Sequence, residues 1–289
     1  MNYINMNDVC NIKKNACNYF AVFGTSRRLK FVYYLESIHD KFVADRTGLV
    51  VREGFSVMLL CEEGNFWLPH NQFVVRTSIK EFVIDLENYV ENWEKGYYLL
   101  VYLPVFSKVL EFKIGFDVGT KLEIIDSHQN GILGYIGEGN TKGIGVTTST
   151  MSFYNIIARK REYSVKNLAY EFECFEEQLL HIEQLVACDQ IVVELNSIAS
   201  VELFMTNFPF WSMKLQSYSG NIIFWTSVSC IVLSKKIDVL LETISAVKDV
   251  NYIALNKEKN FVNECMFDPR GLLNDHGNII LARKIMETI

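Results

Sequence analysis

Two different patterns of hydrophobic and polar residues meet near residue 118. Before this point, short runs rich in aromatic and β-branched residues are separated by glycine, asparagine and acidic residues, as expected of antiparallel strands. The runs are 19–23, 29–35, 49–51, 55–60, 72–75, 97–103 and 111–114, and we interpret 79–90 as one more strand. The pattern predicts an antiparallel, jelly-roll-like β-sandwich over residues 1–118.

After residue 118, strand-like runs alternate with segments of helical period. The predicted strands are 122–125, 162–168, 190–196, 221–226 and 251–255, and the predicted helices are 151–160, 173–186, 234–247 and 278–289. Ser234 is expected to cap the helix that follows it. Such an alternation predicts an α/β domain over 119–289, with a doubly wound parallel sheet and helices on both faces.

The end of the run Leu122–Ile125 carries the first candidate chemistry. We interpret this run as a buried parallel strand that delivers Asp126 and Ser127 to the carboxyl edge of the sheet, ahead of the flexible Gly131. In open α/β sheets, ligands bind at that edge. Ser127 is therefore a candidate nucleophile. The alternative is a Ser/Asp pair that caps a turn.

Several short blocks, taken in order, resemble the SGNH/GDSL-type ester hydrolases that carry an N-terminal GxDLY-type β-sandwich. Residues 125–131, Ile-Asp-Ser-His-Gln-Asn-Gly, resemble that family's nucleophile block Gly-Asp-Ser-Ile-Thr-Gln-Gly. Residues 54–58 resemble its Gly-Phe-Asp-Leu-Tyr signature, and 166–170 resemble its block Asn-Leu-Gly-Phe-Ser-Gly. Residues 268–277 resemble its terminal block Asp-Gly-Val-His-Pro-Asn-Asp-x-Gly. The resemblance covers nearly the whole chain.

The resemblance implies acyl transfer at an ester through a serine nucleophile, with a small-molecule or carbohydrate ester, often an O-acetyl sugar, as substrate. The Asn196 side-chain amide and the Ser127 backbone N–H are the implied oxyanion donors. The implied catalytic residues are Ser127, Asp268 and His276, and the implied oxyanion and substrate-binding residues are Asn196, Asn167, Asp126 and Gly131.

Three positions depart from the family's blocks. Leu272 stands where the histidine belongs, and Pro269 takes the aspartate's place unless a one-residue insertion lets Asp268 serve. Phe172 aligns with the last glycine of the second block. Leucine cannot accept a proton, and general-base assistance is worth roughly 10²–10⁴-fold in rate; His276 is the nearest substitute. Two hypotheses follow: an ester hydrolase or O-acyltransferase that uses Ser127, or a catalytically inactive binding or scaffold protein of the same fold.

Composition narrows the choice of partners and compartment. The formal net charge of −6 argues against a nucleic-acid or anionic membrane surface. The seven cysteines show no CxxC spacing, which favours reduced thiols and predicts neither a metal site nor a cofactor. Without a signal peptide or a long apolar run, the expected location is the cytoplasm.

The glycine-rich segment 137–145 is not a GxxxxGK[ST] motif, and we interpret it as a loop that borders the Ser127 site. The oligomeric state is not indicated.

Overall fold

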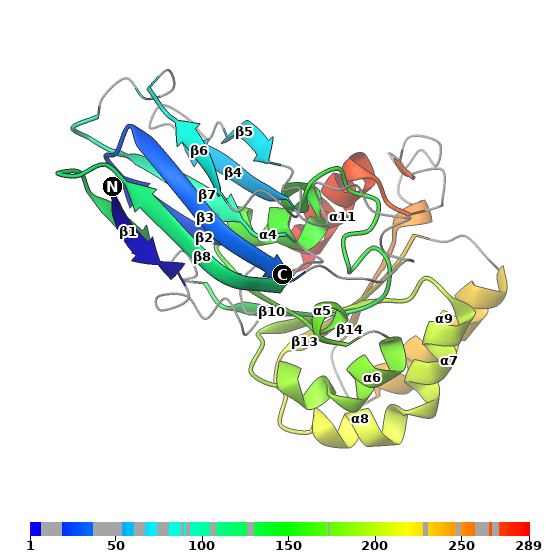
Figure 1. The fold of residues 1–289 in the computed structure, drawn as a ribbon. Coiled ribbons are helices and arrows are strands. Elements are labelled where there is room, and N and C mark those ends of the chain that lie inside the picture. The colour runs from blue at the N-terminus through cyan, green and yellow to red at the C-terminus, as the bar shows by residue number, and fades with distance from the viewer. Residues whose placement is uncertain are drawn as a thin grey trace. The chain divides into compact units, whose positions relative to one another are not determined.

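The computed structural model of the 289-residue chain describes the greater part of the sequence in two compact units. The first unit covers 1–127 with 147–150, and the second covers 128–146 with 151–289. Figure 1 shows the antiparallel strands in blue to green and the helices of the second unit in green to red. The described residues are 1–6, 19–36, 54–60, 67–73, 81–87, 90, 93–104, 108–125, 130–172, 174–227, 231–246, 250–257, 266–267 and 272–289.

The first unit contains two antiparallel sheets. One has the order β1 (Asn2–Asn5), β8 (Lys108–Phe116), β3 (Arg28–Glu36) and β6 (Glu81–Asp85). The other has the order β5 (Trp67–Phe73), β4 (Phe55–Leu60), β7 (Tyr97–Tyr102), β2 (Tyr19–Gly24) and β9 (Leu122–Ile125). Their inner faces share one core, in which Phe55 and Phe112 stack with ring centroids 5.0 Å apart. The predicted sandwich is confirmed, including a strand within 79–90; the run 49–51 lies outside the described residues.

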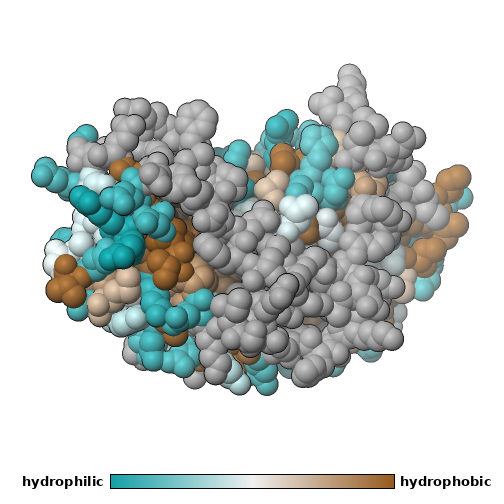
Figure 2. Space-filling model, turned by 45° about the horizontal axis from the view of Figure 1, so that its top comes forward, coloured by the Kyte–Doolittle hydropathy of each residue, from teal (hydrophilic) through white to brown (hydrophobic). Residues whose placement is uncertain are grey.

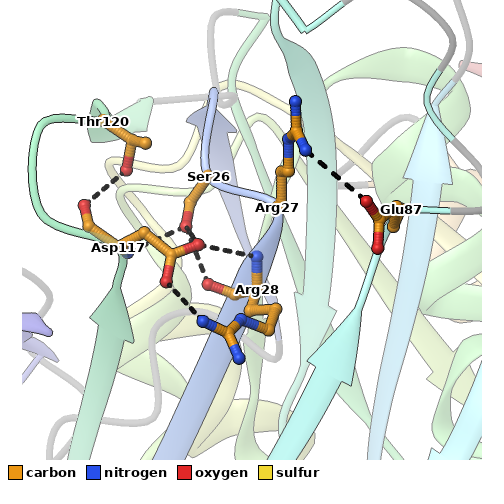
Figure 3. A network of polar contacts seen from close by, with 6 residues as sticks. All are labelled: Ser26, Arg27, Arg28, Glu87, Asp117 and Thr120. Carbon is orange, nitrogen blue, oxygen red and sulfur yellow. Dashed lines mark hydrogen bonds and ion pairs between the residues drawn. The ribbon is translucent and has the colours of Figure 1, made fainter.

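A buried hydroxyl joins the turn before β3 to the turn after β8, as Figure 3 shows. Ser26 Oγ accepts a hydrogen bond from the Asp117 backbone N–H at 2.9 Å, and its nearer acceptor is the Arg28 carbonyl oxygen at 2.7 Å. The Asp117 carboxylate also accepts a hydrogen bond from the Arg28 backbone N–H at 3.2 Å and lies 3.6 Å from the Arg28 guanidinium. Because Ser26 is fully buried, we interpret this network as structural.

The second unit is built on a five-stranded parallel sheet. Its order is β11 (Ser164–Asn167), β10 (Ile132–Ile136), β12 (Gln190–Glu194), β13 (Asn221–Thr226) and β14 (Val250–Ala254). Helices α4 (Phe153–Arg161) and α11 (Asp275–Thr288) lie on one face, and α6 (Phe175–Leu180), α7 (Ile198–Thr206), α8 (Phe208–Lys214) and α9 (Ile231–Ser245) lie on the other (Figure 1). Its shorter helices are α5 (Leu168–Glu171), η3 (Ile182–Leu185) and η4 (Leu255–Lys257), and η2 (Ser149–Met151) spans a boundary between the two units. The predicted doubly wound architecture is confirmed.

Aromatic side chains hold both helical layers against this sheet. On the α4 face, the Phe153 ring lies 5.6 Å from both Tyr135 of β10 and Trp225 of β13. On the opposite face, Phe204 of α7 packs edge-on against Phe224 of β13 at 5.3 Å. Alternate residues of β13 therefore fill two separate cores, which is why its sequence is almost wholly apolar.

The prediction that residues 122–125 form the first strand of the parallel sheet is wrong. Leu122–Ile125 forms β9, which pairs antiparallel with β2 in the sandwich. The strand of the parallel sheet that precedes α4 is β10, Ile132–Ile136. The burial pattern explains the difference. In β9, Leu122 is buried and Glu123 is exposed, as on a one-sided edge strand, whereas β10 is buried along nearly its whole length. The glycine-rich segment 137–145 therefore directly follows a strand of the parallel sheet.

Two helix boundaries also differ from the prediction. Ser234 does not cap α9, which begins at Ile231, because Leu233 and Ile237 already form its buried stripe. The helix predicted over 173–186 is interrupted at His181, whose ring stacks on Phe172 with centroids 4.3 Å apart.

No helix in the described part of the chain is long and apolar enough to cross a membrane. On the face shown in Figure 2, hydrophobic side chains of described residues form separate patches between hydrophilic ones. Large exposed apolar residues include Val118, Met213 and Ile231.

Candidate functional site

The carboxyl edge of the parallel sheet is formed by the ends of β10 and β12 and by the loop 137–146. The loop folds back on itself through backbone hydrogen bonds from Lys142 N–H to the Glu138 carbonyl at 2.8 Å and from Ile144 N–H to the Gly139 carbonyl at 2.9 Å. This compact turn places Asn140 and Thr141 over the end of β12, where Glu194 is the last residue of the strand.

The Glu194 carboxylate is the centre of this edge. The side chain is 3% exposed, and each oxygen accepts several hydrogen bonds. Oε1 accepts from Asn140 Nδ2 at 2.7 Å and Asn196 Nδ2 at 2.8 Å. Oε2 accepts from the Thr141 hydroxyl at 2.7 Å, the Thr141 N–H at 2.9 Å and the Glu138 N–H at 3.2 Å. Such a set of donors satisfies the acceptor capacity of a buried carboxylate.

Asn196 lies just beyond the end of β12, but its amide is engaged at both ends. Nδ2 donates to Glu194, and Oδ1 accepts from the Ser227 N–H at 2.8 Å and the Thr226 hydroxyl at 3.1 Å. The donor that the resemblance assigns to an oxyanion is therefore bonded to a carboxylate of the same chain.

Asn167 fixes the loop from its other side. This buried residue ends β11, and its Nδ2 donates to the Thr141 carbonyl at 2.8 Å. Its Oδ1 accepts from the Ala169 N–H at 3.0 Å and caps α5. Gly131 does not belong to this group: it directly precedes β10, at the amino end of the sheet, where the neighbouring Ile132 N–H donates to Asp189 at 2.6 Å.

Only one of the three predicted catalytic residues, His276, lies in the part of the chain that the structure describes. Asp126, Ser127 and Asp268 lie outside the described residues, so their roles stay predictions. His276 is an exposed residue in the first turn of α11. The strand that was expected to present Ser127 at the parallel-sheet edge belongs to the sandwich instead.

The loop after β10 resembles the nucleophile block at as many positions as residues 125–131 do, and it alone follows a strand of the parallel sheet. Residues 137–143 read Gly-Glu-Gly-Asn-Thr-Lys-Gly, which keeps both end glycines and the threonine of Gly-Asp-Ser-Ile-Thr-Gln-Gly. Gly139 then stands at the serine position. A Cβ atom built on Gly139 would lie 2.8 Å from Leu272 Cδ2. By these two resemblances, Gly139 takes the place of the family's serine and Leu272 that of its histidine, and the two residues lie side by side.

Leu272 is held there by its neighbours in the chain. The Leu273 N–H donates to Asn140 Oδ1 at 2.7 Å, which ties this segment to the β10 loop. The Leu273 carbonyl accepts from Asn278 Nδ2 at 2.9 Å, and Asn278 Oδ1 accepts from the Phe153 N–H at 3.0 Å. Sequence reasoning missed the Gly139 position because it assigned the strand to 122–125; the apolar run 132–136 followed by glycine is the signal that marks it.

The carboxyl group of Glu138 makes the stability of the folded protein depend on pH. Loss of hydration raises the pKa of this carboxyl group above its usual 4.5, and the Glu194 charge raises it further, whereas Lys142 lowers it. A carboxyl group with a raised pKa in the folded protein costs stability as the pH rises through that pKa. Because Glu138 is exposed, we expect Glu138→Gln to raise the free energy of unfolding, measured in urea, by less than ~1 kcal/mol at pH 7 and to leave it unchanged at pH 3. An equal change at both pH values would contradict this.

Among the described residues, no group of three or more His, Cys, Asp or Glu side chains is arranged to hold a metal ion.

No protein-family model and no curated sequence matches the chain. Solved structures do share its fold. A protein described as a GDSL-like lipase from Bacteroides ovatus is 14% identical, with a TM-score of 0.76 over 97% of this chain and 87% of that one. A family two carbohydrate esterase from Clostridium thermocellum, in complex with cellohexaose, is 14% identical, with a TM-score of 0.62 over 94% and 90%. A salicylyl-acyltransferase from a tetracycline biosynthetic pathway is 13% identical, with a TM-score of 0.61 over 92% and 79%. At these identities the likeness establishes an SGNH-like α/β fold.

Proposed function

We propose that this chain is a catalytically inactive binding protein built on the fold of SGNH-type ester hydrolases. The observation that carries the proposal is the proximity of Gly139 and Leu272: a side chain at position 139 would begin 2.8 Å from Leu272 Cδ2. Acyl transfer through a serine needs a hydroxyl nucleophile, a base within hydrogen-bond reach and donors for the oxyanion. Gly139 offers no hydroxyl, and Leu272 cannot accept a proton.

The electrostatics of the edge support the same proposal. The tetrahedral intermediate of ester hydrolysis develops a negative charge, which must lie near preorganised donors. Asn196 Nδ2 already donates to the Glu194 carboxylate at 2.8 Å. An oxyanion formed beside that donor meets a buried negative charge, and two like charges repel strongly where water is excluded.

The ligand class rests on analogy with the solved structures. The names of the fold relatives include a carbohydrate esterase in complex with cellohexaose and an acetyl xylan esterase. We therefore propose a neutral carbohydrate or its acetyl ester as the ligand. The negative net charge disfavours nucleic acid and anionic membranes as partners, and the cytoplasm remains the proposed location.

A hydrolysis assay tests the absence of catalysis. Wild-type protein and Ser127→Ala are expected to release p-nitrophenol from p-nitrophenyl acetate at the same background rate, because an inactive binding protein does not use Ser127 as a nucleophile. Neither protein should react with a fluorophosphonate probe, while an active serine esterase assayed in parallel reacts with both reagents. Calorimetric titration with acetylated xylan should detect binding. Ser127-dependent turnover would overturn the proposal.

The second candidate is an ester hydrolase or O-acyltransferase that uses Ser127 with Asp268 and His276. The names of the solved structures that share the fold favour it, since they include esterases and an acyltransferase. In that case the probe labels Ser127, and His276→Ala is as damaging as Ser127→Ala. Activity then falls when the imidazole is protonated at low pH, because the protonated ring cannot act as a base.

A further inference from the structure

We infer that the carboxyl edge of the parallel sheet is a carboxylate-binding site whose resident ligand is the side chain of Glu194. The hydrogen bond between Asn196 and Glu194 also supports the proposed function, but this site does not depend on whether the chain is catalytic.

The converging groups are all hydrogen-bond donors without charge. The two amide groups of Asn140 and Asn196 approach Oε1, and two backbone N–H groups with one hydroxyl approach Oε2. These donors come from the loop after β10 and from the end of β12, which are brought together only by the fold. Convergence of neutral donors on a single point is how proteins bind anions through dipoles.

The donors also specify a carboxylate rather than a neutral group of the same shape. A carboxylate presents two accepting oxygens, and both are used here. A glutamine side chain has one oxygen and one N–H₂ group. Whichever way that amide is turned, its N–H₂ faces either Asn140 and Asn196 or Thr141 and the Glu138 N–H. Donor then meets donor in a buried place, where an unpaired polar group is costly.

The donors themselves are held in place from outside. Asn140 Oδ1 accepts from the Leu273 N–H at 2.7 Å, and Asn196 Oδ1 accepts from the Ser227 N–H at 2.8 Å. Each amide is thereby fixed with its N–H₂ group directed at Glu194. The Thr141 carbonyl accepts from Asn167 at 2.8 Å, which fixes the turn that carries the remaining donors. The site is therefore preorganised and does not depend on Glu194 alone for its shape.

The fragment that Glu194 supplies beyond its Cβ atom has the composition of acetate. Removing it by Glu194→Ala leaves the donors without an acceptor and a space of matching size. Free acetate is then expected to occupy that space and to restore stability. In the wild-type protein the same space is filled, so acetate is expected to have no effect there.

Thermal unfolding in sodium acetate, compared with sodium chloride at equal ionic strength, tests the inference. We expect the melting temperature of Glu194→Ala to rise by about 3 °C when acetate reaches roughly ten times its dissociation constant. The matched control is Val192→Ala, which truncates a buried residue of the same strand but leaves an apolar cavity. Acetate should stabilise neither that control nor the wild type. A folded Glu194→Ala that gives the same melting temperature in both salts would overturn the inference.

A second measurement covers the case in which Glu194→Ala does not fold. The variant is then diluted from urea into acetate or chloride, and recovery of the near-ultraviolet circular dichroism signal is compared. Recovery in acetate only supports the inference, and no recovery in either salt contradicts it. Glu194→Gln should be at least as destabilised as Glu194→Ala; wild-type stability of the glutamine variant would also overturn it. None of these measurements involves ester turnover. Their outcome therefore tests the carboxylate site and leaves the test of the proposed function independent.

Discussion

Gly137→Ala is expected to destabilise the second unit by about 2–4 kcal/mol, the range for overpacking combined with a disturbed buried hydrogen bond. A Cβ atom at this position would lie 2.2 Å from the Thr141 hydroxyl oxygen and 2.7 Å from Glu194 Cβ. The backbone cannot move away, because buried Gln178 bonds both the N–H and the carbonyl of Gly137 at 2.9 Å. Urea unfolding monitored by circular dichroism measures the loss.

Gly139→Ala is the matched control for this prediction, since it adds the same methyl group two residues further along the same loop. Its Cβ atom would meet only the end of the flexible Leu272 side chain at 2.8 Å. That side chain has room to change rotamer because it is not fully buried. The loss for Gly139→Ala should therefore be less than half that for Gly137→Ala. Equal losses would show that the loop is not held in the way described.

The hydrophobic pattern predicted most of the architecture, because hydrophobic residues recur with a single spacing along most of the strands and helices. Strands such as β7 and β13 and helices such as α4 follow the runs predicted for them, since their burial alone decides their structure. The exception was Leu122–Ile125. Four apolar or alternating residues before a turn fit an edge strand of a sandwich as well as a strand of a parallel sheet, and only long-range pairing decides between them.

The candidate site was predictable only in part for the same reason. Asn196 and Asn167 were placed at strand ends, and the structure brings Asn167 to the loop after β10 and Asn196 to Glu194, which that loop also contacts. Glu194 was not singled out, because a glutamate at the end of an apolar strand resembles a solvated end residue. Its importance comes from donors more than 50 residues away, with Asn140 and Thr141 at sequence separations of 54 and 53. No local pattern contains that information.

Asn140 connects the end of β12 to the segment that carries Leu273. Its contacts lead to a prediction whose size depends on pH. Its Nδ2 donates to Glu194 Oε1 at 2.7 Å, and its Oδ1 accepts from the Leu273 N–H at 2.7 Å. The residue is 2% exposed. Asn140→Asp keeps the shape and the acceptor, but it replaces the donor with a second carboxylate oxygen against Glu194.

Asn140→Asp is expected to destabilise the second unit by about 3–5 kcal/mol at pH 8, as for an uncompensated buried charge. Two adjacent carboxyl groups can share one proton, so the pKa of one of them is raised in the folded variant. A raised pKa in the folded state means that the penalty is absent below the pKa of the unfolded chain, about 4, and grows as the pH rises through the folded value. Urea unfolding at pH 5 and pH 8 should therefore show a clearly smaller loss at pH 5. Asn130→Asp, at an exposed amide that donates to the Arg161 carbonyl, is the control and should change stability by less than ~1 kcal/mol at either pH. A loss for Asn140→Asp that is the same at both pH values would mean that the new carboxylate does not meet Glu194, and the arrangement of donors around Glu194 would then be wrong.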